Sequence, residues 1–315
     1  MEIEKLEKIL SEFGDNVKFN YDLKKKNWFN IGGKSKVYFK ADNLKELVNF
    51  LKKLNNDEKI FILGAGSNTL ITDKIFDGVV IKLSKNFNNI TLLRDEIIIA
   101  GSAVLDKSLS DFAMKNNLSG FEFLSCIPGT IGGGIRMNAG CFENEFKDIL
   151  LFVQAIDKIG NVKTLSSKNI NFEYRKSNIP DDLIFLSASF KGIKSNKEKI
   201  SDKIISYKTE KEKNQPTKIK TSGSTFKNPI FQTDKKVWEL IKESVPLDKS
   251  FGDAYISKKH CNFFVNKGNA KFEDMKNLID YVAKNVLEKT GVRLEKEIKI
   301  FTKFYYYTIE NFVRY

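Results

Sequence analysis

The sequence has few of the residues that mark secreted, disulfide-linked or metal-binding proteins. Its 315 residues include 3 Cys and 1 His. Cys126, Cys141 and Cys261 are widely spaced and odd in number, which argues against a disulfide framework and fits a reducing cytoplasm. The single histidine, His260, belongs to no set of His, Cys and carboxylate residues with metal-ligand spacing, so we predict no metal site.

Long apolar runs are also missing. No stretch of 18 or more apolar residues occurs, and the amino terminus alternates acidic and basic residues where a signal peptide would be basic and then apolar. We therefore predict a cytoplasmic protein without a membrane span. Apolar residues make up 41% and charged residues 30%, which excludes a wholly disordered chain, and the length suits two or three domains.

Arginine is scarce although the chain is basic. Lys and Arg number 53 against 40 Asp and Glu, a net charge of +13, which can steer anionic partners such as nucleic acids, nucleotides or phosphorylated sugars. Only five of these cations are arginines: Arg94, Arg136, Arg175, Arg293 and Arg314. Because bidentate recognition of phosphates and bases favours Arg, nucleic-acid binding is an open but weaker interpretation.

Hydrophobic periodicity predicts a mixed α and β chain. A helix is expected over residues 44–54, capped by Asp42 or Asn43, and another over 273–289, stopped by Gly291. Further helices are expected over 105–115 and 195–215, the latter the best linker candidate. Strands are expected at 59–63, 78–83, around 90–100, and at 149–156, 162–165, 183–190 and 295–301.

Two glycine-rich segments follow predicted strands. The first, FILGAGSNTL at 61–70, lacks the third glycine of a dinucleotide fingerprint and, taken alone, is more often a plain turn. The second, residues 127–140, is so rich in glycine that it should form neither helix nor strand. Glycine lets a backbone approach phosphate closely, so together the two segments indicate a cradle for an extended, phosphate-bearing cofactor.

Six motifs then occur in the order and spacing of one enzyme family. They are GAGSN at 64–68, IPGTIGG at 127–133, MNAG at 137–140, YRKS at 174–177, GSTFKNP at 223–229 and LEKEI at 294–298. In these motifs the chain resembles the UDP-N-acetylenolpyruvoylglucosamine reductase (MurB) family over nearly its whole length.

The resemblance implies an α+β fold. It consists of an FAD-binding fold of the p-cresol methylhydroxylase type, with two α+β subdomains, and a third α+β domain that binds substrate. We place the first subdomain at 1–84, with 298–315 able to rejoin it, the second at 85–205, and the substrate domain at 206–297.

The resemblance also implies FAD as cofactor and NADPH as hydride donor. FAD should be bound noncovalently, because His260 lies outside both glycine-rich segments. The residues that match cofactor-binding positions are Gly64, Ala65, Gly66, Ser67, Asn68, Ile127, Pro128, Gly129, Gly132, Gly133, Asn138, Ala139 and Gly140.

Three residues match the catalytic positions of the family. Arg175 would stabilise the substrate carboxylate as negative charge develops, Ser224 would protonate the carbon, and Glu297 would act as an acid. Without the resemblance, Arg175 is more often a surface ion-pair partner and Ser224 a turn serine. Glu295 and Glu297 share one face of a regular strand, so only motif register selects Glu297.

The matching substrate contacts are Tyr174, Lys227 and Asn228. The implied activity is NADPH-dependent reduction of UDP-N-acetylglucosamine enolpyruvate to UDP-N-acetylmuramate, a step of peptidoglycan precursor synthesis for the cell wall. The short connection from YRKS through Pro180 to the strand near Leu183 indicates the shorter, type II class. We expect a monomer that binds no nucleic acid and no membrane. The alternatives are another FAD-dependent oxidoreductase of the same fold and a basic nucleic-acid-binding protein.

Overall fold

The computed structural model describes residues 3–55, 57–94, 96–217 and 219–302. The chain forms two compact units. Unit 1 comprises residues 1–19, 37–65 and 78–214, and unit 2 comprises 20–36, 66–77 and 215–315. The chain therefore passes between the units several times before it enters the long carboxy-terminal part of unit 2.

The first layer of unit 1 combines short helices with a sheet of strand order β1-β2-β5-β3. Its elements are α1 (Ile3–Leu10), η1 (Ser11–Asn16), β1 (Val17–Asp22), β2 (Lys34–Ala41), α2 (Leu44–Lys53), β3 (Ile60–Ile62), β5 (Phe76–Leu83) and η3 (Lys85–Asn88). Phe39 and Phe50 stack at 3.8 Å between ring centroids in the core beneath α2. This core buries Leu47 and Leu51 of the apolar face that the sequence predicts for residues 44–54, whereas Leu44 is exposed.

A capping network fixes the start of α2. The Asn43 side chain accepts a hydrogen bond from the Glu46 N–H at 2.9 Å, and the Glu46 carboxylate accepts from the Asp42 N–H at 2.9 Å. Asn43 is thus the cap, and Asp42 is not. Together the two contacts satisfy N–H groups at the helix end that would otherwise lack partners.

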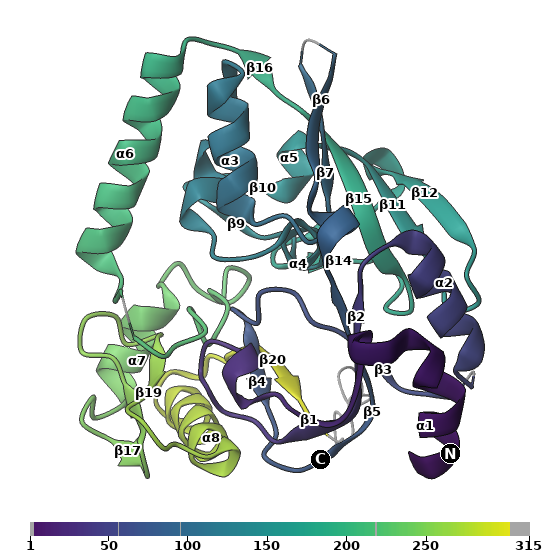
Figure 1. The fold of residues 1–315 in the computed structure, drawn as a ribbon. Helices are drawn as coiled ribbons and strands as arrows, with labels where there is room; N and C mark the ends of the chain where they lie inside the picture. Colours follow the sequence, from purple (N-terminus) through teal and green to yellow (C-terminus); the bar gives the residue numbers. More distant parts are fainter. Residues whose placement is uncertain (1–2, 56, 95, 218, 303–315) are drawn as a thin grey trace. The chain divides into compact units, whose positions relative to one another are not determined.

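The second layer of unit 1 is a five-stranded antiparallel sheet of order β12-β11-β15-β7-β6 (Figure 1). The strands are β6 (Ile90–Arg94), β7 (Ile97–Gly101), β11 (Leu150–Ile156), β12 (Val162–Ser166) and β15 (Ile184–Lys191). Its helices are α3 (Asp106–Lys115), η4 (Glu122–Cys126), α4 (Ile131–Met137), α5 (Phe146–Ile149), η5 (Ser167–Asn169) and α6 (Lys197–Asn214). Helices α3, α4 and α5 share one hydrophobic core with this sheet.

Three two-stranded ribbons complete unit 1. They are β8 (Leu118–Ser119) with β16 (Ile193–Lys194), β9 (Gly140–Cys141) with β10 (Asn144–Glu145), and β13 (Phe172–Glu173) with β14 (Lys176–Ser177). The last two ribbons carry residues of the MNAG and YRKS motifs.

Unit 2 has its own hydrophobic core around two helices. Its elements are η2 (Lys24–Lys26), β4 (Thr69–Ile71), α7 (Val237–Ser244), β17 (Ser250–Phe251), β18 (Ala254–Ile256), β19 (Phe264–Asn266), α8 (Phe272–Thr290) and β20 (Lys299–Phe301). Strand β20 pairs in parallel with β4, and β17, β18 and β19 form an antiparallel sheet. Five apolar residues of α8 are fully buried, and Gly291 ends the helix with a left-handed backbone. They are Met275, Leu278, Ile279, Val282 and Val286.

Two expectations from the sequence are wrong. Residues 131–137 form helix α4 although three of them are glycines. The expected strand at 295–301 is regular only over Lys299–Phe301, because its first part is bulged. The other predicted helices and strands are confirmed to within a few residues. Most of the 298–315 segment, which is expected to rejoin the first subdomain, lies outside the described residues.

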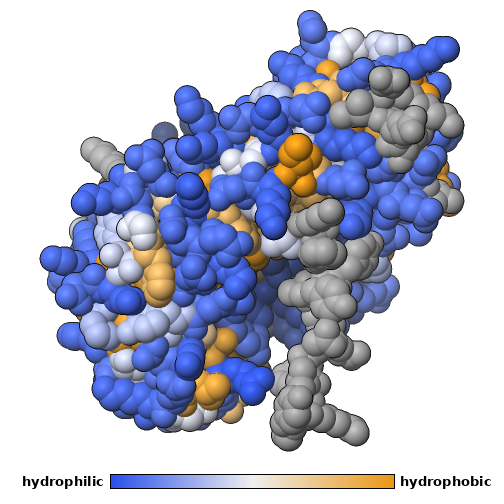
Figure 2. All heavy atoms as spheres, turned by 90° about the horizontal axis from the view of Figure 1, so that it is seen from below, coloured by the Kyte–Doolittle hydropathy of each residue, from blue (hydrophilic) through white to orange (hydrophobic). Residues whose placement is uncertain are grey.

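The face in Figure 2 is mainly hydrophilic, with small separate hydrophobic patches. Phe231, at 95% exposed, is the most exposed large apolar side chain among the described residues. No helix in the described ranges is long and apolar enough to cross a membrane.

The α2 cap gives a test of the fold. Replacing Asn43 with Ala removes the acceptor for the Glu46 N–H, so we expect a loss of about 1 kcal/mol in the free energy of unfolding. Urea denaturation at fixed FAD concentration measures it. Asn49→Ala is the matched control, because Asn49 is exposed on the same helix and should change stability by less than about 0.5 kcal/mol. Equal stability of the two variants would contradict the capping role.

Candidate active site

The two predicted glycine-rich segments meet within unit 1. A Cβ atom on Gly64 would lie 2.8 Å from the Thr130 hydroxyl, so the GAGSN and IPGTIGG segments touch at these residues. The Lys82 ammonium donates a hydrogen bond to the Gly64 carbonyl and holds the start of the first loop. The two segments that the sequence predicts to form a cradle thus come close at the Gly64 backbone and the Thr130 side chain.

Backbone N–H groups of the first loop have no hydrogen-bond acceptor in the part of the chain that the structure describes. Among the described residues, no hydrogen bond uses the N–H groups of Ala65, Gly66, Ser67 or Asn68. Gly66 has a φ of 68°, and a Cβ there would lie 2.2 Å from the Lys26 carbonyl oxygen, so only glycine fits. A run of free N–H groups is the donor set that binds a diphosphate.

The glycines of α4 have different surroundings. A Cβ on Gly134 would lie 2.2 Å from the Phe146 ring, and one on Gly132 would lie 3.2 Å from Ser102, so both glycines pack closely against the protein. A Cβ on Gly133 would have no neighbour nearer than 3.5 Å. Gly133 therefore presents bare backbone that a cofactor can approach. Such a backbone surface within unit 1 fits the approach of a flat cofactor such as FAD.

A buried carboxyl group lies directly under the second segment. Asp106 is fully buried, and neither of its oxygens has a hydrogen-bond partner among the described residues. A Cβ on Gly129 would lie 2.4 Å from one of these oxygens, so glycine is required there. Burial raises the pKa of Asp106 well above its ordinary value of 3.8. The group is therefore held as a neutral acid over a wider pH range than an exposed aspartate.

Arg175 lies in the tight turn between β13 and β14. Its φ of 57° puts a large side chain in the left-handed region, which is strained for residues other than glycine. Its guanidinium donates a hydrogen bond to the Gly140 carbonyl at 2.7 Å and lies 3.7 Å from the Glu145 carboxylate. It also lies 4.8 Å from the centre of the Tyr174 ring. The YRKS and MNAG motifs are thus in direct contact.

Three more strained residues surround this contact. Asn138, Phe142 and Glu143 also have positive φ angles. Asn138 ends α4 and is fully buried, and its side-chain amide donates to the Glu145 carboxylate at 2.9 Å and to the Glu173 carbonyl at 3.1 Å. Strain of this kind persists where surrounding contacts enforce it, often at functional sites.

In unit 2, the GSTFKNP segment runs between two other segments. On one side the Thr225 N–H donates to the Asn262 carbonyl at 2.8 Å, and Ser224 pairs with Phe263. On the other side Phe226 pairs with Lys296. The buried Asn262 side chain bonds both the N–H and the carbonyl of Phe226, which fixes the register. Ser224 is therefore held on a segment with hydrogen bonds along both edges.

Glu297 lies on a bulge beside this segment. Its N–H donates to the Thr225 carbonyl at 2.8 Å, and the next N–H, of Ile298, reaches the same oxygen at 3.5 Å. Two residues opposite one define a β-bulge, which re-aims side chains. Glu297 is half-buried, whereas the exposed Glu295 carboxylate pairs with the Lys227 ammonium at 3.2 Å. The structure thus separates two glutamates that strand alternation could not.

Asn68 connects the first glycine-rich loop to Glu297. Its side-chain amide donates to the Glu297 carbonyl at 3.2 Å, and its own carbonyl accepts from the Lys299 N–H at 2.9 Å. Within unit 2, a residue expected to bind cofactor therefore lies beside a residue expected to act in catalysis.

The other expected site residues have clear local environments. Lys227 is paired with Glu295, and the Asn228 side chain accepts from the Val237 N–H at 3.1 Å, at the start of α7. His260 is half-buried against Phe263, and burial lowers its pKa. No group of His, Cys and carboxylate residues within the described ranges could hold a metal ion.

The cysteines near the glycine-rich segments are shielded. Burial raises the pKa of the Cys141 thiol to about 12, and Cys126 is buried. The Lys211 ammonium of α6 donates to the Cys126 carbonyl, and burial lowers the pKa of this lysine. Because the Cys141 thiol stays protonated, it is a poor nucleophile, which fits the packing role expected from the sequence.

Sequence reasoning missed Glu145, Asp106 and Arg136. Arg136 donates to the carbonyls of Ile179, Pro180 and Leu183 and holds the short connection after YRKS. A usable signal existed for Glu145, which follows the MNAG motif by five residues. No local pattern marks Asp106, because burial depends on tertiary packing.

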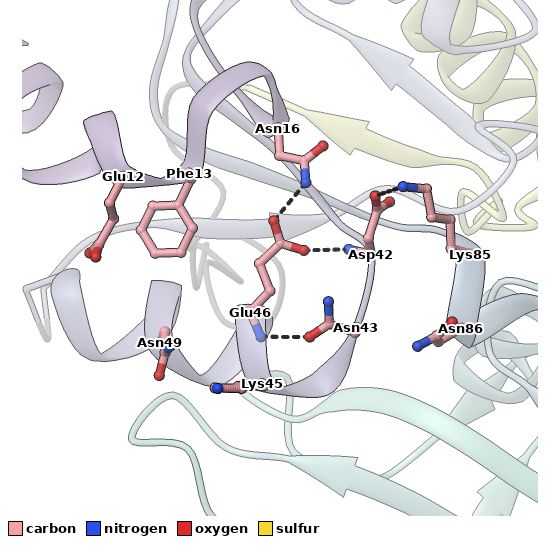
Figure 3. Close-up of a pocket in the computed structure, with 10 residues that line it drawn as sticks. All are labelled: Glu12, Phe13, Asn16, Asp42, Asn43, Lys45, Glu46, Asn49, Lys85 and Asn86. Atoms are coloured by element: carbon pink, nitrogen blue, oxygen red, sulfur yellow. Dashed lines mark hydrogen bonds and ion pairs between the residues drawn. The ribbon is translucent and has the colours of Figure 1, made fainter.

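The hollow in Figure 3 lies in unit 1 and contains none of the expected site residues. Half of the labelled residues that line it are paired with one another. Asn16 donates to Glu46 at 2.6 Å, and Lys85 pairs with Asp42, which raises the pKa of the lysine. This hollow is the solvent-facing side of the α2 capping network.

Two family models match the chain. Residues 35–166 match an FAD binding domain, and residues 215–301 match the C-terminal domain of UDP-N-acetylenolpyruvoylglucosamine reductase. The second match contains the GSTFKNP and LEKEI segments described above.

Named relatives match over almost the full length. A UDP-N-acetylenolpyruvoylglucosamine reductase of Pelagibacter ubique is 65% identical, covering 95% of this chain and 99% of the relative. One of Rickettsia typhi is 44% identical over 91% of this chain and 96% of the relative. The crystal structure of the Thermus caldophilus reductase (MurB) has a TM-score of 0.77 at 28% identity, covering 91% of this chain and 98% of that chain.

The buried Asp106 gives a test by pH. Because its pKa is raised on folding, the native state keeps a proton that the unfolded chain releases, so this residue lowers the free energy of unfolding as pH rises above 3.8. Asp106→Asn cannot ionise, so we expect it to become more stable than wild type as pH rises, with little difference at lower pH. Denaturant titration at several pH values measures this, with the exposed Asp182→Asn as control. A stability difference independent of pH would contradict the buried neutral acid.

Proposed function

The chain belongs to the UDP-N-acetylenolpyruvoylglucosamine reductase family, and from that premise we propose that it reduces UDP-N-acetylglucosamine enolpyruvate to UDP-N-acetylmuramate with NADPH as hydride donor. The fold is the FAD-binding fold of the p-cresol methylhydroxylase type combined with this family's carboxy-terminal domain, and the protein is an FAD-dependent oxidoreductase. The reaction serves peptidoglycan precursor synthesis.

One observation carries the proposal. Unit 2 aligns the GSTFKNP and LEKEI segments through a 2.8 Å hydrogen bond from the Glu297 N–H to the Thr225 carbonyl, next to Ser224. An FAD-dependent enzyme with other chemistry would need its flavin segments but not this arrangement. The family match over residues 215–301 therefore favours the reductase over another oxidoreductase of the same fold, and over a basic nucleic-acid-binding protein.

The cofactor would be held by the glycine-rich segments. The N–H groups of residues 65–68 supply donors for the diphosphate, and Gly133 supplies bare backbone. When bound, FAD supplies the hydride for the methylene carbon of the enolpyruvyl group. His260 lies outside both segments and packs on Phe263, which supports noncovalent attachment.

Residues of the chain would stabilise the negative charge that develops on the substrate and would supply the proton to its carbon. The Arg175 guanidinium pairs with the substrate carboxylate and stabilises the negative charge that develops there. Ser224 donates its proton to the neighbouring carbon, and half-buried Glu297 acts as an acid beside it. Tyr174, Lys227 and Asn228 bind the substrate.

Other expectations stay predictions. They are the three-part domain division, the type II class, the cytoplasmic location and the monomeric state. The connection of residues 178–183, held by Arg136, supports the type II class because it leaves a short path between β14 and β15.

The two glutamates of the LEKEI motif, Glu295 and Glu297, give a direct test of the proposed function. Glu297→Gln removes the acid without changing shape, so we expect turnover of UDP-N-acetylglucosamine enolpyruvate with NADPH to fall about 10²–10⁴-fold. Glu295→Gln is the matched control, two residues away, exposed and paired only with Lys227 among the described contacts, and should stay near wild type. Steady-state kinetics at equal FAD content measures both. Glu297→Gln with wild-type turnover would overturn the assigned role.

A further inference from the structure

The contacts of the Glu145 carboxylate give it a role that no motif assigns. It lies on β10, directly opposite Gly140 of β9, and its side chain is 18% exposed. One carboxylate oxygen lies 3.7 Å from the Arg175 guanidinium. The other accepts from the Asn138 amide at 2.9 Å and from the Lys147 ammonium at 2.8 Å.

The backbone around Glu145 is fixed. A Cβ on Gly140 would lie 2.8 Å from the Glu145 side chain, so glycine is needed for the two residues to face one another. The connecting residues Phe142 and Glu143 both have left-handed backbones, which matches a tight type I′ hairpin turn. The Phe142 ring stacks on Tyr207 of α6 at 4.1 Å, which holds the turn. Glu145 therefore projects from a rigid ribbon.

Arg175, in contrast, has a side chain with many rotamers on a strained two-residue turn. Its hydrogen bond to the Gly140 carbonyl fixes one nitrogen, and the Glu145 carboxylate attracts the other. At 3.7 Å this ion pair is too long to be a hydrogen bond, so Glu145 acts on the guanidinium through its charge. A guanidinium held in one direction is suited to receive a substrate carboxylate.

We propose that Glu145 is the positioning residue for Arg175, setting its guanidinium to receive the substrate carboxylate. This inference rests on the proposed function, because it assumes that Arg175 meets that carboxylate. The same Glu145 carboxylate also accepts a hydrogen bond from Asn138 of the MNAG motif. One carboxylate therefore contacts both the motif expected to bind cofactor and Arg175.

Kinetics of the holoenzyme test the inference. Glu145→Gln keeps the shape and an acceptor for Asn138 but removes the charge, so we expect kcat/KM to fall about 10–100-fold. Glu143→Gln, on the same hairpin but exposed, should leave kcat/KM unchanged. In an Arg175→Lys background, Glu145→Gln should cost little more, because the two residues act as one unit. Equal losses in both backgrounds, or full activity of Glu145→Gln, would overturn the proposal.

A second readout does not depend on turnover. The chain has only five arginines, so the Nε–H signals of a nitrogen-labelled sample can be assigned, with Arg175→Lys identifying its own signal. We expect the Arg175 signal to show faster side-chain motion in Glu145→Gln than in wild type or Glu143→Gln. Unchanged motion would overturn the inference, whereas a wild-type protein that does not turn over the substrate would instead defeat the proposed function. If Glu145→Gln does not fold, Glu145→Asp is the alternative variant. It keeps the negative charge but moves it away from Arg175, so it should increase the side-chain motion of Arg175 in the same way.

Discussion

The approach of Glu145 to Gly140 is the contact on which the surroundings of Arg175 in unit 1 depend. It lets one carboxylate reach both Asn138, at the end of α4, and Arg175, in the turn between β13 and β14. The backbone strain at Asn138, Phe142, Glu143 and Arg175 is local to this contact. Such strain costs about 1–3 kcal/mol for each residue, so the surrounding packing must enforce it.

In unit 2, hydrogen bonds and not backbone strain hold the candidate site residues in place. Its GSTFKNP segment is bonded along both edges, and Asn262 fixes the register at Phe226. A β-bulge at Glu297 interrupts the regular alternation of side chains, so Glu297 and Glu295 do not have equivalent surroundings. Asn68 joins the first glycine-rich loop to the backbone of Glu297, so that the GAGSN and LEKEI segments are hydrogen-bonded to each other.

Much of the fold could be predicted from the sequence where long amphipathic patterns occur. Helix α8 buries the five residues that its period selects, and Gly291 ends it. Helix α4 could not be predicted, because each glycine disfavours a helix by about 1 kcal/mol relative to Ala. Tertiary packing overrides this, since Gly134 meets the Phe146 ring where no side chain would fit.

Only those residues of the candidate site that belong to a sequence motif could be predicted. Spacing alone places Glu295 and Glu297 on one face, and the bulge that separates them depends on pairing with Thr225, far away in the chain. Asp106 resembles any helix-starting aspartate in sequence, and its burial comes from residues of other elements. Glu145 lies close to a motif but outside it, so only its contacts identify it.

In the proposed reaction, one flavin passes a hydride from NADPH to the enolpyruvyl sugar nucleotide. The most direct measurement is the visible absorption spectrum of the purified protein under anaerobic conditions, first with NADPH and then with UDP-N-acetylglucosamine enolpyruvate. We expect flavin bands that bleach with NADPH and return only when that substrate is added. A protein that stays colourless after incubation with FAD would contradict the cofactor assignment, and bleaching without recovery would contradict the substrate.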